Sequence, residues 1–288
     1  MANVLLLRAP SQDGGDKYED SIRIQGYTPI SVPVLETVLK NLPALKEIIQ
    51  AGHSVKGCAG VIITSGRACE AWRTVVQELA SASANTDWAT VPFYVVGEAT
   101  AKALEEIREV VGDSPFTPKD IRGRAESGTS ERLAHFILDD LSSTTDSGKL
   151  LYLTGDKNRD TLPTILKEGG FDLEPLQVYE TQGSSKFPAD LQKALNSVPT
   201  GRWWIVYFAP SAAEFVTPTL RKHFDLRSID SPPDTSSTIP SIAAIGPTTS
   251  TFLREQLSLH VRAVPSKPTP EALVAAIVAA DSATSAAL

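Results

Sequence analysis

The chain has 288 residues, of which 42% are hydrophobic and 21% are charged, a composition typical of proteins that bury their apolar residues in compact domains. At the usual ~100–200 residues per domain, this length predicts two domains. The net charge is −7, and no segment is rich in Lys or Arg with interleaved aromatic residues, which argues against nucleic acid as a partner. The two cysteines, Cys58 and Cys69, suit a reducing compartment better than a disulfide framework. No apolar run approaches the ~18 residues of a membrane span, and no signal peptide is recognisable, so we expect a cytoplasmic protein.

Short apolar segments alternate along the chain with amphipathic ones, which is the pattern of strands and helices in a parallel α/β fold. Strands are predicted at residues 4–8, 28–35, 60–64, 93–96, 149–153, 176–179, 203–208, 242–245 and 259–264. Helices are predicted at 18–25, 37–51, 66–80, 99–111, 130–141, 160–167, 189–197, 211–223, 248–256 and 270–280, with Thr269 capping the last one. Segments 112–128, 142–148 and 228–241 are predicted as surface loops, and residues 282–288 as a disordered tail.

The sequence repeats itself at a spacing of about half its length. The segment 26–37 returns as 170–181, and 170 minus 26 is 144. Glu70 and Glu214, each in a similar strand-to-helix segment, are also 144 residues apart. A period this long exceeds the ~20–50 residues of solenoid repeats. It therefore predicts two similar domains with a ligand-binding cleft between them.

Two equivalent segments of the repeat are predicted as connections between these domains. They are residues 33–37 and 176–181, each of which follows a βα unit. Under this prediction, residues 38–175 form one continuous α/β domain, and residues 1–32 plus 182–288 form a discontinuous one. Two connecting strands would permit hinge closure while keeping the domains aligned.

The familiar catalytic signatures are missing from the sequence. No Gly-x-Gly-x-x-Gly follows a predicted strand, no Walker lysine loop occurs, and no Gly-x-Ser-x-Gly elbow is found. The four histidines show no spacing suited to metal ligands. We therefore expect neither a nucleotide cofactor, nor serine hydrolysis, nor a metal site.

Several predicted strand-to-helix turns carry small hydroxyl or glycine residues instead. Helix N-termini present unpaired N–H groups and a partial positive charge, which bind carboxylate or phosphate, and ligands of open α/β sheets lie at these strand ends. A single such turn is also explained by ordinary helix capping, but five of them favour a ligand with many anionic groups. The candidate substrate-binding residues are Thr64, Ser65, Arg67, Gly97, Ala99, Thr100, Gly155, Lys157, Ser211, Gly246, Thr248 and Thr249.

Tyr179 is the candidate catalytic residue. Its partner in the repeat is Leu35, so packing at this position does not require a hydroxyl group. It lies on a predicted connecting strand, beside the expected cleft. Two interpretations stay open: an aromatic ring that packs at an interface, or a phenol that takes part in chemistry.

An ordered series of motifs resembles the uroporphyrinogen-III synthase family over nearly the whole chain. The motifs are Val4-Leu5-Leu6-Leu7-Arg8, Thr64-Ser65-x-Arg67-Ala68, Val95-Val96-Gly97-x-Ala99-Thr100, Gly155 to Leu162, Val178-Tyr179-x-Thr181, Phe208-x-Pro210-Ser211, Ala244-Ile245-Gly246-Pro247-Thr248-Thr249 and Pro268-Thr269-Pro270. The resemblance implies an α/β fold of two flavodoxin-like domains, each a parallel sheet with helices on both faces, joined by a two-stranded linker. Gly66, where the family commonly has proline, and the long 228–241 loop depart from the pattern.

The resemblance also implies a lyase activity on hydroxymethylbilane, a linear tetrapyrrole with eight carboxylates. Its terminal hydroxyl leaves as water, and the fourth ring is inverted through a spiro intermediate as the macrocycle closes. Tyr179 would assist departure of the hydroxyl, although substrate carboxylates could do so instead. The family pattern implies a monomer without a cofactor, in transient contact with the preceding pathway enzyme and with no membrane or nucleic-acid partner.

Two other classes of protein also consist of two similar α/β lobes. An effector-binding module would line its cleft with aromatic and charged side chains, and would be attached to a secretion signal or a DNA-binding domain. A nucleotide-sugar transferase would show a Gly-rich loop or a basic pair for a diphosphate. The sequence shows neither a secretion signal nor a DNA-binding domain, and it has no Gly-x-Gly-x-x-Gly or Walker loop.

Overall fold

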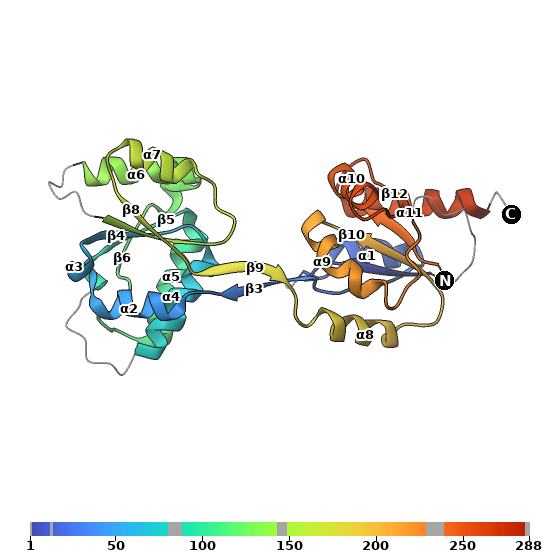
Figure 1. Ribbon diagram of the computed structural model, residues 1–288, viewed down its shortest axis with the longest axis horizontal. Coiled ribbons are helices and arrows are strands. Elements are labelled where there is room, and N and C mark those ends of the chain that lie inside the picture. The colour runs from blue at the N-terminus through green and yellow to red at the C-terminus, as the bar shows by residue number, and fades with distance from the viewer. Residues whose placement is uncertain (1, 12–13, 80–87, 143–148, 229–238, 286–288) are drawn as a thin grey trace. The chain divides into compact units, whose positions relative to one another are not determined.

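The computed structural model describes residues 2–11, 14–79, 88–142, 149–228 and 239–285, and the chain divides into two compact units (Figure 1). Unit 1 consists of Met1–Glu36 and Gln182–Leu288, and unit 2 of Thr37–Thr181. Each unit contains a five-stranded sheet, and its neighbouring strands run parallel.

The sheet of unit 2 has the strand order β6-β5-β4-β7-β8. Its strands are β4 (Cys58–Ile63), β5 (Pro92–Val95), β6 (Asp120–Arg122), β7 (Lys149–Thr154) and β8 (Leu173–Gln177). The register places Val61 of the central strand β4 opposite Phe93 of β5 and Leu151 of β7. The central strands are mostly apolar because helices cover both faces of the sheet.

Alternate residues of β4 enter different cores of unit 2. Val61 and Ile63 pack with α2 (Leu42–Ala51), α4 (Gly66–Leu79) and α5 (Gly97–Val111). Ile62 packs with α6 (Ser130–Leu141) and α7 (Thr161–Glu168) on the other face. In Figure 1, α6 and α7 lie above the strands, and α2 and α4 lie below them. The short helices are α3 (His53–Lys56), η1 (Trp88–Thr90) and η2 (Arg124–Ser127).

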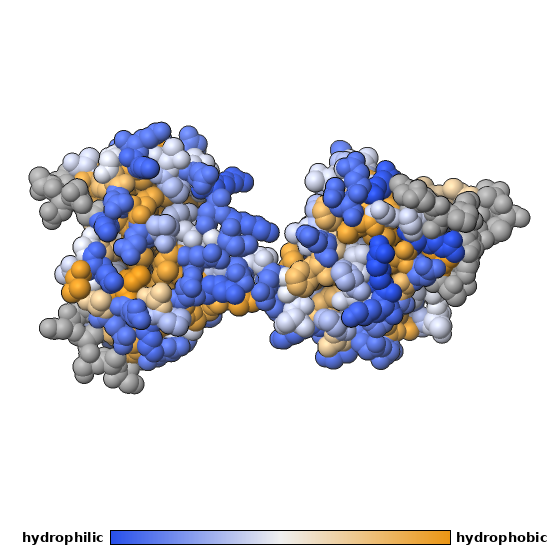
Figure 2. All heavy atoms as spheres, viewed as in Figure 1, coloured by the Kyte–Doolittle hydropathy of each residue, from blue (hydrophilic) through white to orange (hydrophobic). Residues whose placement is uncertain are grey.

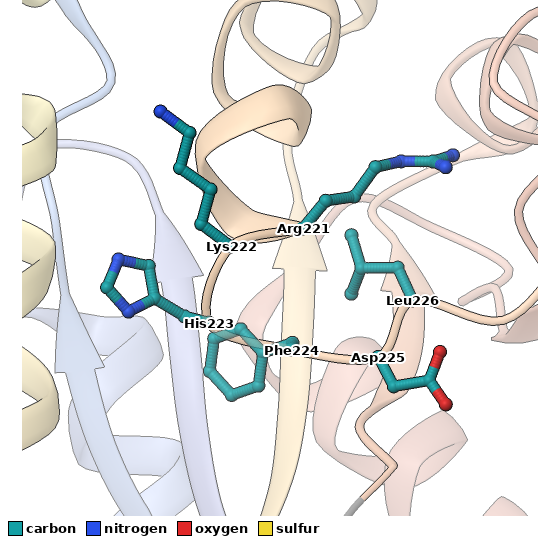
Figure 3. A pocket seen from close by; sticks show the side chains of 6 residues that line it. All are labelled: Arg221, Lys222, His223, Phe224, Asp225 and Leu226. Atoms are coloured by element: carbon teal, nitrogen blue, oxygen red, sulfur yellow. The ribbon is translucent and has the colours of Figure 1, made fainter.

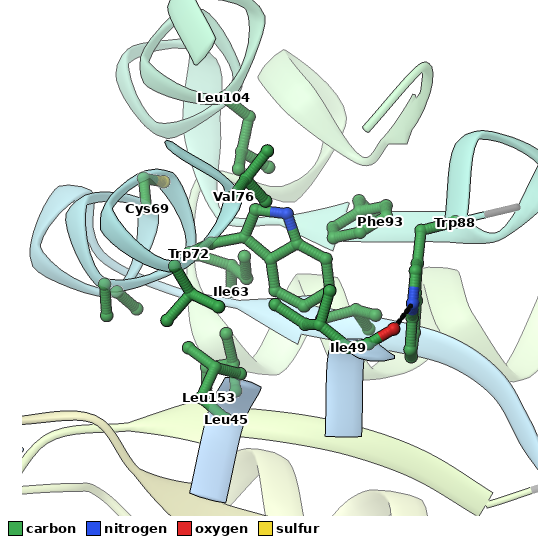
Figure 4. Close-up of a cluster of buried hydrophobic side chains, with 14 of the residues drawn as sticks. Leu45, Ile49, Ile63, Cys69, Trp72, Val76, Trp88, Phe93, Leu104 and Leu153 are labelled. Atoms are coloured by element: carbon green, nitrogen blue, oxygen red, sulfur yellow. Dashed lines mark hydrogen bonds between the residues drawn. The ribbon is translucent and has the colours of Figure 1, made fainter. Parts of the chain in front are cut away.

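Trp72 of α4 lies at the centre of the larger core of unit 2 (Figure 4). Its ring packs edge-to-face against Trp88 at 5.3 Å and against Phe93 at 5.0 Å between ring centroids. Both indole N–H groups have partners, since Trp72 donates to the carbonyl of Phe116 at 3.2 Å and Trp88 donates to that of Ile49 at 2.8 Å. The aromatic rings at the centre of this core therefore pack against one another with both indole N–H groups satisfied.

The sheet of unit 1 has the strand order β12-β11-β10-β1-β2. Its strands are β1 (Ala2–Leu7), β2 (Thr28–Ser31), β10 (Arg202–Tyr207), β11 (Ser241–Ala244) and β12 (Val261–Ala263). Leu5 and Leu7 pack with α8 (Phe187–Ser197), α9 (Pro210–Leu220) and α10 (Pro247–Glu255). Val4 and Leu6 pack with α1 (Lys17–Ile24) and α11 (Pro270–Ser285) on the other face.

The two sheets share one topology. Numbered along the chain within unit 1, the strands follow the order 2-1-3-4-5 of flavodoxin-like folds. Unit 2 shows the same order when its last two strands, β7 and β8, are counted first. The strands β4 and β10 begin at residues 58 and 202, a difference of 144, so the sequence repeat corresponds to equivalent strands of the two units.

The strands β3 (Leu35–Leu39) and β9 (Tyr179–Gly183) form a separate two-stranded sheet. The N–H of Lys40 donates to the carbonyl of Val178 at 2.8 Å, and that of Ser184 to the carbonyl of Val34 at 2.9 Å. Residue numbers rise along β3 as they fall along β9, so the two strands are antiparallel. The boundary between the units falls within both strands. The predicted fold class is confirmed.

Several predicted elements need correction. The predicted strand 28–35 is two strands, β2 and β3, and the predicted helix 37–51 begins only at Leu42, because β3 continues to Leu39 and Asn41 has a left-handed φ of 51°. The predicted strand 176–179 is divided between β8 and β9.

Other corrections concern element ends and loops. The predicted helix 211–223 ends at Leu220. The predicted loop 112–128 contains β6 and η2, and β6 was not recognised because Ile121 is its only apolar residue. Residues 282–285 of the predicted tail continue α11, whereas 143–148, 229–238 and 286–288 lie outside the described residues. The expected cap of α11 is confirmed, since Thr269 Oγ1 accepts from the N–H of Ala272 at 3.3 Å.

Asp16 holds the start of α1 and predicts a pH dependence of stability. Its carboxylate accepts from the N–H groups of Ser11, Tyr18 and Glu19 and forms an ion pair with Arg8 at 2.6 Å. Burial alone would raise the pKa of Asp16, but these hydrogen bonds and the Arg8 charge lower it to about 2. Because the unfolded-state pKa is about 3.9, these hydrogen bonds and the ion pair together add at most about 2.6 kcal/mol, which is present above about pH 5 and is lost as the pH falls toward 2.

Asp16→Asn is therefore expected to lower the free energy of unfolding at pH 7 by about 1–2 kcal/mol and to flatten its decline between pH 4 and pH 2. Urea unfolding at several pH values measures both effects. The exposed Asp20 provides the control, Asp20→Asn. Curves for wild type and Asp16→Asn that stay parallel below pH 4 would contradict the prediction.

Candidate functional site

The predicted site residues lie where strands end and helices begin. In unit 2, Thr64, Ser65 and Arg67 follow β4, Gly97, Ala99 and Thr100 follow β5, and Gly155 and Lys157 follow β7. In unit 1, Ser211 follows β10, and Gly246, Thr248 and Thr249 follow β11. Because neighbouring strands in each sheet are parallel, these residues share the carboxyl edge of the sheet of their own unit.

Tyr179, the first residue of β9, is surrounded by three of the predicted residues of unit 2. Ser65 Oγ donates to the phenol oxygen of Tyr179 at 3.1 Å. The guanidinium carbon of Arg67 lies 5.7 Å from the centroid of the ring. Gly155 lies so close that a Cβ atom on it would be 2.5 Å from the ring. The structure thus brings the candidate catalytic residue together with residues of two strand ends, β4 and β7.

Ser65 links Tyr179 to the start of α4. Its Oγ accepts from the N–H of Ala68 at 3.3 Å while it donates its own proton to the phenol oxygen. With the oxygen of Tyr179 accepting, the phenol O–H is left to donate elsewhere. Hydrogen bonds in series strengthen one another, and the N-terminus of α4 carries a partial positive charge. The arrangement is suited to a phenol that donates a proton.

Arg67 and Asp156 both hold Thr181 of the strand β9. Arg67 Nη1 donates to Thr181 Oγ1 at 3.3 Å, and the N–H of Thr181 donates to Asp156 Oδ1 at 3.1 Å. Asn158 closes the β7–α7 turn by bonding to both the N–H and the carbonyl of Gly155, at 3.3 and 2.6 Å. Sequence analysis missed Asp156 and Asn158, although Asp and Asn near a glycine signal such a turn.

Thr64 belongs to a deeper layer than predicted. Its hydroxyl bonds to Tyr152, which is buried on β7. Burial raises the pKa of Tyr152, and the hydrogen bond from Thr64 offsets part of this rise. Thr64 therefore contributes to the support beneath the cluster, and its expected contact with a ligand is not supported by this geometry.

The β5–α5 turn offers backbone rather than side-chain groups. Gly97 has a φ of 74°, a conformation that favours glycine, and a Cβ there would meet open space. Ala99 is exposed, but Thr100 is only 7% exposed, and its carbonyl lies 3.7 Å from Cys69 Sγ. Helical geometry turns the Thr100 side chain toward the core, so only the backbone N–H group of this residue is available for the expected contact with a ligand. The N–H groups of the first turn of α5 are what this segment presents.

The turns of unit 1 show the same division between exposed and buried positions. Ser211 is exposed in the first turn of α9, and Thr248 is exposed in the first turn of α10. Thr249 is only 4% exposed, so its side chain also lies in the core, and its backbone N–H group is what remains for the expected contact. Gly246 is the N-cap residue of α10 in an extended conformation. Lys157, in unit 2, is exposed as expected.

Arg8 is a charged residue at a strand end that sequence analysis assigned to a strand and not to the site. It follows β1, and its side chain is 24% exposed beside Asp16. Its guanidinium carbon lies 5.1 Å from the Tyr18 ring centroid and 5.5 Å from that of Phe208. The signal was available, because β1 ends at Leu7 as β7 ends at Thr154, which makes Arg8 the equivalent of Gly155.

A cavity of about 550 Å³ lies elsewhere, beside the segment from Arg221 to Leu226 that follows α9 (Figure 3). Phe224 of this segment packs on Trp203, near the start of β10, so the cavity is at the amino edge of the sheet. Figure 3 shows the charged ends of Arg221 and Lys222 pointing away from each other. These side chains do not converge on a common point and do not extend the predicted site.

The surfaces of both units mix hydrophilic and apolar side chains on the face seen in Figure 2. Among the described residues, no group of three or more His, Cys, Asp and Glu side chains is placed to hold a metal ion. Within the same ranges, no helix combines the length and apolar character needed to cross a membrane.

The two units with flavodoxin-like strand order define a two-domain α/β protein. The helix N-termini at its strand ends and the phenol of Tyr179 among polar groups are suited to an anionic small molecule. Comparison with known families makes this specific. Residues 16–275 match the family model described as uroporphyrinogen-III synthase HemD. The chain belongs to the uroporphyrinogen-III synthase family of hydro-lyases in tetrapyrrole biosynthesis, which confirms the resemblance seen in the sequence.

The chain is similar to individual proteins of known identity. The chain is 26% identical over 282 residues to uroporphyrinogen-III synthase of Saccharomyces cerevisiae, covering 91% of this chain and 90% of the relative. It is 27% identical over 281 residues to that of Schizosaccharomyces pombe, covering 98% of each. Among solved structures, uroporphyrinogen-III synthetase from Helicobacter pylori matches with 18% identity and a TM-score of 0.47, covering 97% of this chain and 99% of that one.

Proposed function

We propose that this chain converts hydroxymethylbilane to uroporphyrinogen III, with loss of water and inversion of ring D. The observation that carries the proposal is the family match over residues 16–275. The cluster around Tyr179 supports it, because the reaction begins with a hydroxyl that must leave as water.

Tyr179 is proposed as the proton donor of this first step. The phenol O–H gives its proton to the terminal hydroxyl, the C–O bond breaks, and water departs as the electron pair of the first pyrrole ring forms an azafulvene. Ring D then attacks through its substituted carbon to form the spiro intermediate, which breaks and recloses with the ring inverted. The proton lost when the closed ring regains its aromaticity can return to Tyr179. The hydrogen bond from Ser65 supports this role, because it stabilises the oxygen after the proton has left.

The carboxylates of the substrate are proposed to bind at helix N-termini. The chain has a net charge of −7, so attraction by overall charge is not available, and local donors must supply it. The first turns of α4, α5, α9 and α10 offer backbone N–H groups and a partial positive charge. Arg67 and Lys157 add exposed positive charge at the strand ends of unit 2.

The proposal predicts the product isomer. Hydroxymethylbilane generated in situ and incubated with the protein is expected to give predominantly the inverted, type III macrocycle, because the bound ligand is held in the conformation that leads to the spiro intermediate. Separation of the product isomers by chromatography measures the ratio. The same mixture without the protein is the control, and a parallel reaction with a chelator is expected to give the same ratio. An isomer ratio equal to that of the spontaneous reaction would refute the proposal.

A further inference from the structure

The ring of Tyr179 occupies the space that a side chain on residue 155 would fill. A Cβ atom placed on Gly155 would lie 2.5 Å from both Cε2 and Cζ of Tyr179 and 2.8 Å from its phenol oxygen. These distances are far below van der Waals contact, so even a methyl group cannot coexist with the ring in this position. The crowded atoms are those at the hydroxyl end of the ring.

Backbone conformation does not explain why residue 155 is a glycine. Gly155 is absent from the described glycines that have a positive φ, in contrast to Gly97. Nor is its backbone free to bind an anion, because Asn158 occupies both its N–H and its carbonyl. The ligand contact predicted for Gly155 is therefore replaced by a different role that depends on its missing side chain.

We infer that Gly155 is the positioning residue for Tyr179: the missing side chain leaves the space in which the phenol oxygen lies within reach of Ser65 Oγ. This inference rests on the proposed function, in which Tyr179 donates a proton. The 3.1 Å bond between Ser65 and Tyr179 requires the ring to lie against Gly155. A ring displaced from residue 155 loses that bond and moves its O–H away from the substrate.

Hydrogen bonds between strands hold the backbone near Gly155, so the ring of Tyr179 is the part that would move if residue 155 carried a side chain. Thr154 pairs with Gln177 in the β7–β8 ladder, and the N–H of Val178 donates to the carbonyl of Thr154 at 2.9 Å. These bonds hold the backbone immediately before Gly155 and Tyr179, and the bond from the N–H of Thr181 to Asp156 holds the chain after them. Because the colliding atoms belong to the end of one side chain, a methyl group at residue 155 is accommodated by rotation of Tyr179 about its side-chain bonds, with the fold retained.

Gly155→Ala tests the inference against a matched control. Gly128, also in unit 2, has an ordinary φ of −61° and open space around a Cβ, so Gly128→Ala should behave as wild type. Gly155→Ala is expected to lower kcat by about 10²-fold, the same factor as Tyr179→Phe, with KM little changed. The double variant Gly155→Ala with Tyr179→Phe should be no worse than Tyr179→Phe alone, because both changes remove one interaction. A further loss in the double variant would show that Gly155 acts independently of Tyr179 and would overturn the inference.

A measurement independent of activity separates this inference from the proposed function. The chain has six tyrosines, so protein labelled with 3-fluorotyrosine gives six ¹⁹F signals, and Tyr179→Phe identifies the one that belongs to residue 179. Gly155→Ala is expected to shift that signal and Gly128→Ala to leave it in place. An unshifted signal would overturn the positioning role whatever the activity. A shifted signal with normal activity would uphold the displacement of the ring but remove Tyr179 from the proposed chemistry.

Discussion

Tyr179→Phe is expected to lower kcat by about 10²-fold, which is the contribution typical of a general acid. The substitution keeps the ring that packs beside Gly155 and Arg67 and deletes only the hydroxyl that Ser65 contacts. Binding of the substrate depends chiefly on other groups, so KM should change little. Steady-state kinetics of the formation of the type III isomer measure both constants.

Tyr152→Phe is the matched control for this experiment. Tyr152 lies in the same region of unit 2 and also forms a hydrogen bond, with Thr64, but it is buried. Removal of the Tyr152 hydroxyl is expected to change kcat by less than about threefold, since this side chain is only 5% exposed. If Tyr179→Phe falls within the same threefold range, its ring serves packing alone, and a substrate carboxylate is then the better candidate for the acid.

Trp72→Ala is expected to destabilise unit 2 by about 3–5 kcal/mol, the usual cost of removing a large aromatic side chain from a core. The side chain is fully buried, and its removal deletes two aromatic contacts and leaves the carbonyl of Phe116 without its indole donor. Such a loss is a large fraction of the stability of a typical domain. The variant should unfold at a much lower urea concentration than wild type.

One further variant separates the contributions to this loss of stability, and another serves as a control. Trp72→Phe keeps an aromatic ring but not the N–H, so it should cost less than alanine, by an amount that reflects the retained packing. Val110→Ala, at a residue 56% exposed on α5, should change stability by no more than about 0.5 kcal/mol. Because unfolding of a two-unit chain need not be a single transition, circular dichroism should be followed together with tryptophan fluorescence. Equal midpoints for Trp72→Ala and wild type would contradict the packing argument.

The order and type of most elements follow from local pattern. Apolar strands such as β4 and β10 are recognisable because helices cover both their faces, and the cap of α11 by Thr269 is visible in a few adjacent residues. The errors arose where local signals compete. The segment from Leu35 to Leu39 was assigned partly to a helix because its pairing partner, β9, lies far along the chain.

Some features of the candidate site could be predicted from the sequence, and others depend on the tertiary structure. Position at a strand end is a local property, so the turns containing Ser65, Gly97 and Ser211 could be located from the sequence. Whether a given hydroxyl faces the core or the solvent depends on the rotation of its helix against the sheet, so the burial of the Thr100 and Thr249 side chains could not be predicted from the sequence.

The sequence by itself determined the repeat, the α/β class, the family and the set of strand-end turns, because each of these is written in short segments or in their order along the chain. Only the tertiary structure decided that Ser65 bonds to Tyr179, 114 residues away, and that the ring of Tyr179 fills the space left by Gly155. Contacts of this kind depend on strand register and on the direction of side chains from separate elements, and close packing makes them sensitive to a single methyl group. The sequence shows that residue 155 is a glycine, but only the fold shows that the ring of Tyr179 lies where its side chain would be.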